Sequence, residues 1–475
     1  MKDVAGISWC SRASVTGYGF RVFQLEVDFN GSHARISFSR NDQHKWGIMS
    51  YYLNYEGGKI HFSLPEKWNV LSSRDCASAS VIEDVAGEID RALDNPIGTP
   101  TLEELARPDM NAVVLFDDIQ RATPANLAIP AILNRLNKAG LPDERVTAIC
   151  AMGTHPLLND EQLHRKAGEE AFRRLKDRIY NHEAQSSDNI LIGRTHRGTI
   201  VEINKHVAQA DLVIGIGTCM PHPWSGFGGG AKIIMPGVSS YRAIGDHHYT
   251  WIRHRNCKLN LLDGNPFFED MAEIARISGL AFKLDFLLNE TDQVIRAFAG
   301  DPVEEHQQAS EHAASIYLVP LPKQADVVIT SAAPLEIGIQ SEKALINSKF
   351  ATRAGGTVIW VASQKRAGPL MELVDHMATA KTANDYHHML VRGDIPKNLR
   401  AYGISFIMLG IVFKELSEKF NVIHVTEGFS REQVEKMNFA YAPSLDAAIQ
   451  QTYQKMPQAD VAIFPSGGTI IPSVK

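Results

Sequence analysis

Three short polar segments carry residue types that could do acid–base chemistry, and each follows an apolar run typical of a buried parallel strand. The first contains Asp118 and Arg121, the second contains His155, and the third contains His222. An imidazole can take up or release a proton near neutral pH. Because the carboxyl ends of parallel strands meet at one edge of a sheet, where ligands bind, we expect these side chains to surround a small molecule.

Each of these residues also has a purely structural interpretation. Asp118 and Arg121 could form an ion pair, and a single histidine after a strand often only hydrogen-bonds within its own loop. His155 and His222, however, both follow predicted strands of one domain, and each is next to a proline. This repetition favours a functional site.

A glycine-dense loop follows the third segment and contains Gly228, Gly229, Gly230 and then Lys232. It is not a P-loop, because alanine precedes the lysine and isoleucine follows it. The loop fits a GxGxxA dinucleotide pattern, but the residues before it are not a strand that enters a nucleotide turn. Glycines let a backbone approach a ligand closely, and a desolvated lysine can act as a nucleophile or stay covalently linked. The loop therefore predicts a lysine held against a flat cofactor.

The histidine pair His247-His248 suggests either surface side chains or a metal ligand near the lysine loop. The chain has no HExxH motif and no paired cysteines. A zinc site would therefore combine these two residues with His222 and His254.

The alternation of strand-like and helix-like segments predicts an α/β protein with two domains. Each domain is expected to have a mostly parallel sheet flanked by helices, with the active site in the cleft between the domains. The strand-like runs are 59–64, 112–116, 146–151, 211–216, 325–330, 356–361, 404–409, 421–425 and 460–464, and the helix-like segments include 80–93, 126–138 and 340–352.

We expect residues 1–48 to be an extension that need not belong to the fold. Residues 49–317 should form a first, catalytic domain, and residues 318–475 a second domain whose end packs back on the first. The second domain has its own polar segment after its first strand, leading to Gln340 and Lys343.

Composition excludes several classes of partner. The formal net charge is −6, and basic residues are dispersed rather than gathered in runs, so neither nucleic acid nor an acidic membrane is an expected partner. The five cysteines are widely spaced and form no CxxC pair, which indicates a reducing compartment. No apolar run is long enough to cross a bilayer, and the N-terminus has no signal pattern. We therefore expect a cytoplasmic protein that binds a small molecule.

The motifs together resemble the nickel-pincer lactate racemase family, from about Tyr55 to the C-terminus. The order and the spacing of the motifs carry the resemblance, and the combination is specific although no single motif is. The matching motifs are Asp118-x-x-Arg121-x-x-Pro124, Gly153-Thr154-His155, Pro221-His222, Lys232-x-x-x-Pro236-Gly237, His248, Asp263-Gly264-Asn265-Pro266 and Gln340-x-x-Lys343.

The resemblance implies a cofactor, a nickel-pincer nucleotide derived from a pyridinium mononucleotide and joined to a lysine at the position of Lys232. It implies that His248 is the imidazole ligand of the nickel, in a flat donor set that suits Ni(II). It also implies cofactor biosynthesis proteins as partners.

The remaining roles implied by the resemblance concern the substrate. His155 and His222 correspond to the two acid/base histidines. Arg121 and Asp118 correspond to groups that bind the carboxylate and position the cofactor, and Gln340 and Lys343 are expected to reach in from the second domain.

This set of roles predicts a racemase or epimerase of a small 2-hydroxy acid. A proton on the carbon beside a carboxylate is hard to remove, so the hydrogen is expected to leave as hydride while a histidine takes the hydroxyl proton. The resulting 2-keto acid can then receive the hydride on its other face. Two alternatives remain open: a zinc-dependent hydrolase that uses His222 and His248, and a non-catalytic protein that binds a sugar acid or a nucleotide.

The chain departs from the family pattern at three places near the substrate. Gln120 stands where threonine is usual, Tyr402-Gly403 stands where a tryptophan is expected, and segment 364–368 lacks the usual acidic residue. The cofactor-side residues are all kept. The expected substrate is therefore a 2-hydroxy acid that is larger or more polar than lactate.

Overall fold

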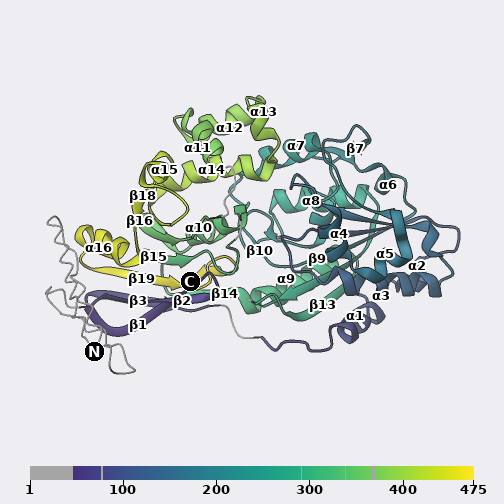
Figure 1. The fold of residues 1–475 in the computed structure, drawn as a ribbon, viewed down its shortest axis with the longest axis horizontal. Coiled ribbons are helices and arrows are strands. Elements are labelled where there is room, and N and C mark those ends of the chain that lie inside the picture. Colours follow the sequence, from purple (N-terminus) through teal and green to yellow (C-terminus); the bar gives the residue numbers. More distant parts are fainter. Residues whose placement is uncertain (1–45, 76–78, 290, 337, 366–369) are drawn as a thin grey trace, which may run out of the picture. The chain divides into compact units, whose positions relative to one another are not determined.

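The computed structural model describes residues 46–475 except 76–78, 290, 337 and 366–369. These residues form two α/β domains, each with a six-stranded, mostly parallel sheet flanked by helices (Figure 1). The predicted fold class is confirmed. Of the predicted extension 1–48, only residues 46–48, which begin β1, lie within the described part of the chain.

The first domain contains a sheet in the order β13-β12-β9-β4-β5-β6. All neighbouring strands are parallel except β13, which runs antiparallel to β12. The chain goes from β4 to β5 on one side and returns to the other side for β9, so the order reverses between β4 and β9, where α/β sheets bind ligands. The strands are β4 (Ala112–Asp117), β5 (Val146–Ala151), β6 (Ile179–Asn181), β9 (Leu212–Thr218), β12 (Leu280–Leu288) and β13 (Val294–Gly300).

The second domain contains an all-parallel sheet in the order β18-β17-β16-β15-β19-β3. Here the order reverses between β15 and β19. The strands are β3 (Trp68–Ser73), β15 (Ala325–Ser331), β16 (Thr352–Val361), β17 (Asn421–Val425), β18 (Ala440–Ala442) and β19 (Ala459–Phe464).

Helices connect most of these strands. In the first domain they are α1 (Val85–Asp94), α2 (Leu102–Leu105), α3 (Ala125–Lys138), α4 (Asp160–Ala167), α5 (Glu169–Leu175), α6 (Lys205–Ala208), α7 (Tyr241–Trp251), α8 (Pro266–Ile277) and α9 (Glu304–Tyr317). In the second they are α10 (Glu342–Ser348), α11 (Leu370–Ala378), α12 (Ala383–Val391), α13 (Lys397–Arg400), α14 (Ile404–Lys419), α15 (Arg431–Lys436) and α16 (Leu445–Lys455). Within the described residues no helix is long and apolar enough to cross a membrane.

Both faces of the first sheet are apolar, which explains its continuous hydrophobic strands. Along β4, Val113 and Leu115 enter one hydrophobic cluster, whereas Val114 and Phe116 enter another on the opposite face. The first of these clusters also contains residues of α14 and β16 in the second domain. The two domains therefore share one continuous hydrophobic core.

Residues 404–409 were predicted as a strand, and this prediction is wrong. They begin α14, a helix of 16 residues that is buried on nearly all sides. A short run that is almost wholly apolar has no polar face that distinguishes a strand from a buried helix. Helices α11, α12 and α13 pack against α14 (Figure 1).

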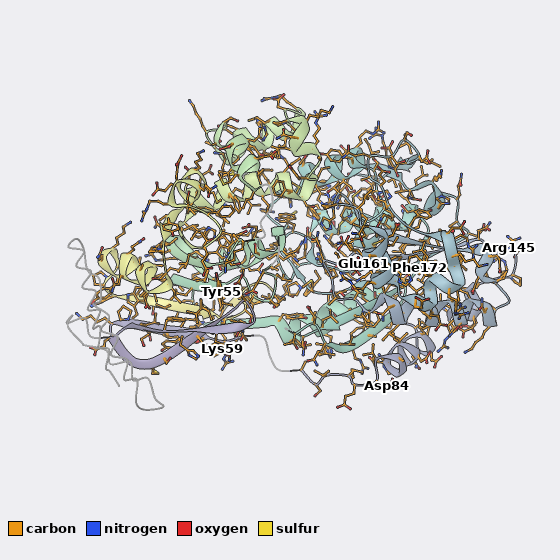
Figure 2. The ribbon with its side chains drawn as sticks, in the orientation of Figure 1. Tyr55, Lys59, Asp84, Arg145, Glu161 and Phe172 are labelled. Carbon is orange, nitrogen blue, oxygen red and sulfur yellow. The ribbon has the colours of Figure 1, made fainter. Side chains whose placement is uncertain are left out.

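The first strands of the chain associate with the second domain. Strands β1 (Trp46–Tyr55) and β2 (Gly58–Pro65) form a hairpin, whose end is marked by Tyr55 and Lys59 in Figure 2. Strand β3 then pairs with β19 as the edge of the second sheet, although residues from 49 onward were predicted to start the first domain.

Three further two-stranded sheets complete the fold. Their strands are β7 (Ile190–Arg194) with β8 (Ile200–Ile203), β10 (Pro221–His222) with β11 (Gly226–Phe227), and β14 (Leu318–Leu321) with β20 (Ile471–Val474). In the last pair, Ile471 packs in one hydrophobic cluster with Leu287 and Ala313 of the first domain.

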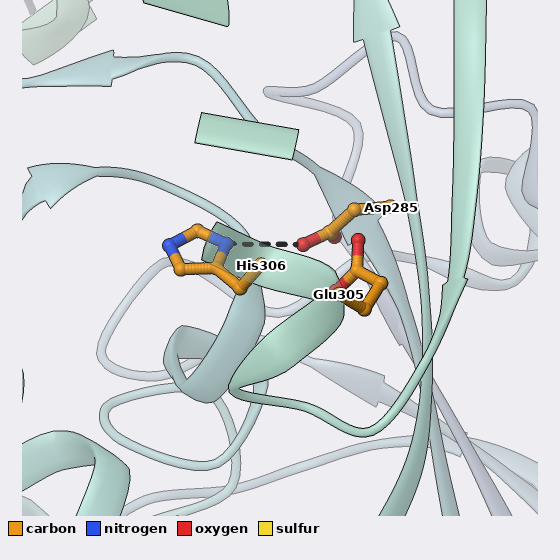
Figure 3. A group of neighbouring side chains, drawn as sticks. All are labelled: Asp285, Glu305 and His306. Atoms are coloured by element: carbon orange, nitrogen blue, oxygen red, sulfur yellow. Dashed lines mark ion pairs between the residues drawn. The ribbon is translucent and has the colours of Figure 1, made fainter. Parts of the chain in front are cut away.

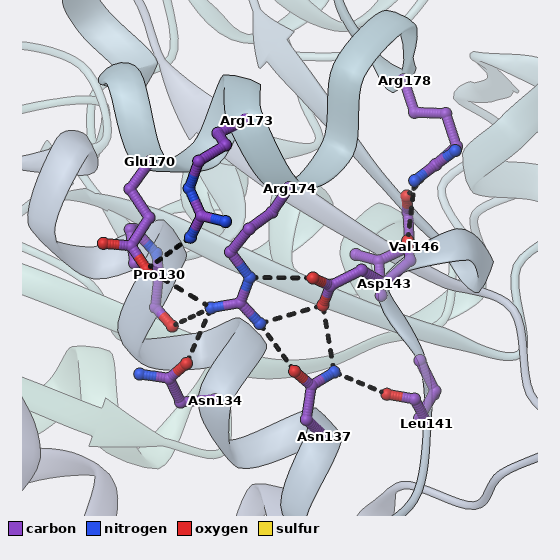
Figure 4. A network of polar contacts seen from close by, with 10 residues as sticks. All are labelled: Pro130, Asn134, Asn137, Leu141, Asp143, Val146, Glu170, Arg173, Arg174 and Arg178. Atoms are coloured by element: carbon purple, nitrogen blue, oxygen red, sulfur yellow. Dashed lines mark hydrogen bonds and ion pairs between the residues drawn. The ribbon is translucent and has the colours of Figure 1, made fainter.

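A polar network at the far side of the first domain joins α3, α5 and the turn before β5 (Figure 4). Arg174 donates two hydrogen bonds to the carboxylate of Asp143, at 2.8 and 2.9 Å. Its other donors reach Asn134 and Asn137 on α3, each at 2.7 Å. One guanidinium group therefore fixes two helices and a turn.

Candidate active site

A cavity of about 150 Å³ lies at the carboxyl ends of β4, β5 and β9, and side chains from both domains line it. It is located where the strand order of the first sheet reverses, as expected for this type of sheet. Among its lining residues are nine that the sequence singled out: Asp118, Arg121, His155, His222, Gly228, Gly229, Lys232, Gln340 and Lys343.

Asp118 and His155 form a direct pair across the ends of β4 and β5. The Nδ1 atom of His155 lies 2.5 Å from Oδ2 of Asp118, which is buried. Burial would raise the pKa of Asp118, but His155, Arg121 and the backbone N–H of Gln120 lower it to about 2. Asp118 is therefore a carboxylate that orients the ring of His155, and Nε2 of His155 is the nitrogen left for a ligand.

His222 and Lys232 form a second pair on the other side of the cavity. The Nζ atom of Lys232 lies 3.2 Å from Nε2 of His222. On the other edge of the ring, Nδ1 lies 2.8 Å from Oγ of Ser225, which donates to the carbonyl of Phe227 at 2.6 Å. Burial and the nearby lysines lower the pKa of His222 well below its usual value. The imidazole is therefore neutral at physiological pH.

Lys232 is placed at the cavity by the glycine loop. It lies on a short 3-10 turn, Gly230–Ile233, at the end of the glycine loop. Burial and the charge of Arg121 lower its pKa to about 7. A large fraction of this amine is therefore uncharged and nucleophilic near neutral pH.

The glycine loop is held from behind by a buried carboxylate. The backbone N–H of Gly230 donates to Oδ2 of Asp285 at 2.6 Å. Gly229 and Gly230 have φ values of +83° and +50°. A Cβ at Gly229 would lie 2.5 Å from the Asp285 carboxylate, and one at Gly230 would lie 2.6 Å from the ring of His306. These two positions therefore require glycine both for conformation and for space.

Behind the loop, four charged or titratable side chains are buried together: Lys283, Asp285, Glu305 and His306 (three of them in Figure 3). Lys283 pairs with Asp285, and Nδ1 of His306 lies 3.5 Å from the same carboxylate. Burial raises the pKa of Glu305 well above its usual value, so Glu305 carries a proton near neutral pH.

Sequence reasoning did not identify this buried group. Asp285, Glu305 and His306 are close enough together to surround a metal ion, but the ammonium group of Lys283 already occupies Asp285 and would repel a cation. The signal for the group was present: Lys283 and Asp285 are two charges on one face of an otherwise apolar strand.

His248 is held in one tautomer by its neighbour. Nε2 of His247 lies 3.0 Å from the carbonyl of Phe267, so it carries a hydrogen and leaves Nδ1 as an acceptor. That Nδ1 lies 3.1 Å from Nδ1 of His248. His248 therefore carries its hydrogen on Nδ1, and its Nε2 has a free lone pair, which is the form that binds a metal.

The structure does not support the predicted alternative of a zinc site. His222, His247, His248 and His254 do not include three residues whose ligand atoms come within 4.8 Å of one another; in the described part of the chain only the group of Asp285, Glu305 and His306 meets this condition.

The second domain contributes Gln340 and Lys343, from the segment after β15. Gln340 lies on a 3-10 turn, Gly338–Ser341, and its Nε2 donates to Oε1 of Gln120 at 3.1 Å, across the two domains. Lys343 is buried, and within the described residues its Nζ has no hydrogen-bond partner. Burial, Arg121 and Lys232 lower its pKa well below the usual value. An anion bound beside Arg121 and Lys343 would supply the negatively charged partner that Lys343 lacks.

The loop that carries His155 also contacts the second domain. The Oγ1 atom of Thr154 accepts a hydrogen bond from the backbone N–H of Ile404 at 3.1 Å, at the first residue of α14. A Cβ at Gly403 would lie 2.3 Å from the carbonyl oxygen of Thr154. The start of α14 therefore fits against this loop without room for a side chain.

Comparisons with known proteins agree with this geometry. Two family models match the chain, the lactate racemase N-terminal domain over residues 55–260 and the lactate racemase C-terminal domain over residues 321–472. Lactate racemase of Lactiplantibacillus plantarum is 28% identical over 396 residues, which are 81% of this chain and 90% of that protein. Lactate racemase of Thermoanaerobacterium thermosaccharolyticum is 32% identical over 315 residues, or 65% of this chain and 73% of that protein.

Two solved structures are also similar. The lactate racemase apoprotein from Thermoanaerobacterium thermosaccharolyticum has a TM-score of 0.79 and 26% identity, and the match covers 90% of this chain and all of that one. A protein from Thermotoga maritima, with a TM-score of 0.57 and 16% identity, covers 83% of this chain and 98% of its own, and shares the fold.

Proposed function

The chain belongs to the lactate racemase family and is an isomerase, and from this premise we propose that it racemises or epimerises a small 2-hydroxy acid by transfer of a hydride. The observation that carries the proposal is the pair of histidines, each with its own orienting partner, around one cavity that basic side chains also line. A protein that only binds its ligand needs the cations but not the two bases.

We propose that the cofactor is a nickel-pincer nucleotide attached to Lys232, with His248 as the nickel ligand. Three features of this chain fit such a group. Gly228 and Gly229 form a part of the cavity wall without side chains, Lys232 has a pKa of about 7, and His248, although it does not line the cavity, has an unprotonated Nε2. When bound, the cofactor supplies the hydride acceptor.

The chain's own residues then bind the substrate and move its protons. Arg121 and Lys343 bind the carboxylate, and Lys343 gains the partner that it lacks. His155, oriented by Asp118, takes the hydroxyl proton through Nε2 and returns it in the reverse direction. His222, held at Nδ1 by Ser225, is the second base and acts through Nε2. One base for each enantiomer accounts for interconversion in both directions.

The two domains exclude water from the keto acid that forms between the half-reactions. We propose that the chain divides at 317/318, between α9 and β14, so that first-domain residues hold the cofactor while Gln340 and Lys343 help to hold the substrate. Because Lys232 must be modified, cofactor biosynthesis proteins are proposed partners, and the cytoplasm is the proposed location.

Mass spectrometry and chiral chromatography test this proposal together. Protein purified from cells that make the cofactor should contain nickel, show a mass adduct on the peptide with Lys232, and racemise at least one acid from a panel of 2-hydroxy acids. His155→Ala and His222→Ala should abolish racemisation but keep the adduct. An unmodified peptide without nickel, or full activity in both variants, would overturn the proposal.

A further inference from the structure

A second, larger cavity of about 650 Å³ adjoins the active-site cavity. Asp118, Arg121, Met152, His155, Thr218 and Gln340 line both. A molecule held by Arg121 and facing His155 can therefore extend from the first cavity into the second. The volume is much larger than the methyl group of lactate requires.

The wall of the second cavity is mainly apolar. Phe406 and Tyr402 come from the start of α14 and the residues before it, Leu335 from the segment after β15, and Leu157 and Leu158 from the segment after His155. Leu158 is buried, whereas Leu157 is 51% exposed. An apolar group that enters from the first cavity would remove part of this surface from water, which favours binding.

The two cavities differ in their charged residues. Lys232, Lys283, Lys343 and Asp117 line only the first cavity, whereas Arg121 and Asp118 line both. The second has two carboxylates of its own, Asp292 and Glu336. Apart from the shared Arg121 and His155, none of the described residues around it is basic. A carboxylate is therefore bound in the first cavity and repelled from the second.

We infer that the substrate is a 2-hydroxy acid whose substituent on C2 is larger than methyl, uncharged and mainly apolar, and that this substituent occupies the second cavity. The inference rests on the proposed function and adds the substrate class to it. The sequence predicted an acid that is larger or more polar than lactate. The second cavity favours a larger acid that carries no second charge.

The bond between Gln120 and Gln340 lies where the two cavities meet. Oε1 of Gln120 accepts from Nε2 of Gln340, and both residues line the second cavity. Oε1 of Gln340 is buried and has no partner among the described residues. The amide pair therefore joins the two domains beside the place where the cavities meet, with one acceptor left unsatisfied.

Substrate preference of the loaded enzyme provides the first test. Racemisation of lactate, 2-hydroxy-4-methylpentanoate, 3-phenyl-2-hydroxypropanoate and 2-hydroxysuccinate would be compared by chiral chromatography. We expect kcat/KM for the two larger monocarboxylates to exceed that for lactate by about tenfold or more, and that for 2-hydroxysuccinate to be lowest. A highest value for lactate or for 2-hydroxysuccinate would overturn the inference.

A variant that fills the second cavity tests where the substituent binds. Leu335→Trp should lower the ratio of kcat/KM for 2-hydroxy-4-methylpentanoate to that for lactate by about tenfold. Leu191→Trp, on β7 and 53% exposed, serves as the matched control and should leave the ratio unchanged. If Leu335→Trp does not fold, the exposed Leu157 offers a second variant, Leu157→Ser, which should lower the same ratio. An unchanged ratio in whichever variant folds would overturn the inference.

Binding to the chain without cofactor separates this inference from the proposed function. Isothermal titration with single enantiomers should give tighter binding for 2-hydroxy-4-methylpentanoate than for lactate, and weaker binding for 2-hydroxysuccinate. Lactate binding as tight as that of the larger acid would overturn the substrate class even if racemisation occurs. A preference for the larger acid in a chain that carries no adduct and no activity would support the cavity assignment and overturn the proposed chemistry.

Discussion

The hydrogen bond between Asp118 and His155 determines which ring nitrogen His155 offers to a substrate. Asn in place of Asp118 keeps the size of the side chain but removes the charge that stabilises a protonated imidazole. We expect Asp118→Asn to lower kcat by about 100-fold or more, with a smaller change in KM. Initial racemisation rates over a range of substrate concentrations measure both constants. An unchanged kcat would contradict the role of Asp118.

Lys232 should titrate near neutrality, because burial and Arg121 both disfavour its charged form. Reductive methylation of the chain without cofactor should therefore modify Lys232 with a midpoint near pH 7, while exposed lysines react at a higher pH. Arg121→Gln removes one of the two causes and should raise the midpoint. Peptide mass spectrometry across a pH series measures both, and a midpoint near pH 10 in the parent chain would contradict the prediction.

Residue types and their order along the chain predicted His155, His222 and Lys232 as site residues, and the cavity contains all three. Their position after buried strands made this possible, because strand ends converge in parallel sheets. The group behind the glycine loop was not predictable in the same way. Glu305 looks like an ordinary first-turn residue of a polar helix, and only the packing of α9 against β12 buries it beside Asp285.

At the scale of elements, the glycine loop is the part of the site that allows least change. Gly230→Ala should displace the loop, because the new Cβ meets the ring of His306 and the φ of +50° is unfavourable for alanine. We expect loss of the Lys232 adduct and destabilisation by about 2 kcal/mol or more. Denaturant unfolding and peptide mass spectrometry measure the two effects.

Gly198→Ala is the matched control for this variant. Gly198 also has a positive φ, +91°, but a Cβ there meets nothing within 4 Å. It should show only the cost of backbone strain, about 1 kcal/mol, and full cofactor attachment. Equal effects at both positions would mean that contact with His306 is unimportant.

Arg174 lies outside the active site and connects elements of the domain that carries it. Its guanidinium group joins α5 to α3 and to Asp143, and its side chain is 9% exposed. Arg174→Met should lower the free energy of unfolding by about 3 kcal/mol, because it leaves the carboxylate of Asp143 without its arginine partner. The neighbouring Arg173→Met removes an arginine whose side chain is 67% exposed and should cost less than about 0.5 kcal/mol. Similar losses in the two variants would contradict the role given to this network.

The sequence distinguished helices from strands where polar residues interrupt the apolar pattern. It did not distinguish them where polar residues are almost absent. Strand β4, with Asp117 and Asp118 at its end, was correctly predicted, whereas α14 was predicted as a strand. The first ten residues of α14 contain only one polar side chain, that of Ser405, so they carry no helical periodicity to detect. The packing of α14 against α7, α11, α12 and α13 determines its conformation instead.

At the scale of the whole molecule, Lys343 lowers the stability of the fold but favours binding of the substrate carboxylate. A buried ammonium group without a partner destabilises the fold. Because the pKa of Lys343 is lowered in the folded chain, its contribution to stability is lost as pH falls from the pKa of a free lysine through the lowered value. Lys343→Met should therefore raise the melting temperature, and the gain should be greatest at low pH.

The same variant should lose the response to ligand. In the parent chain, 2-hydroxy acid anions at millimolar concentration should raise the melting temperature, because binding to the folded state stabilises it. In Lys343→Met this increase should be small. Differential scanning calorimetry of both chains, with and without ligand, measures these melting temperatures. If Lys343→Met without ligand melts at a lower temperature than the parent chain, Lys343 does not destabilise the fold.

The arrangement of the two domains could be predicted only in outline. Alternating strands and helices indicate two parallel sheets, but strand β3 joins the second sheet by pairing with β19, almost at the other end of the chain. No local pattern encodes which of two apolar sheets a strand will extend. The shared core that continues from Ile244 of α7 to Ile407 of α14 depends on the same long-range contacts.

The cations around the cavity also affect how a substrate arrives. The chain has a formal net charge of −6, so at long distance its field slows an approaching anion. Within roughly 8 Å of the cavity at physiological ionic strength, the local field of Arg121 and Lys343 takes over. Added salt weakens the distant repulsion before it weakens the attraction at short range. Association of a hydroxy acid anion should therefore become faster as salt is first raised, the reverse of the behaviour of an enzyme that guides its substrate from afar.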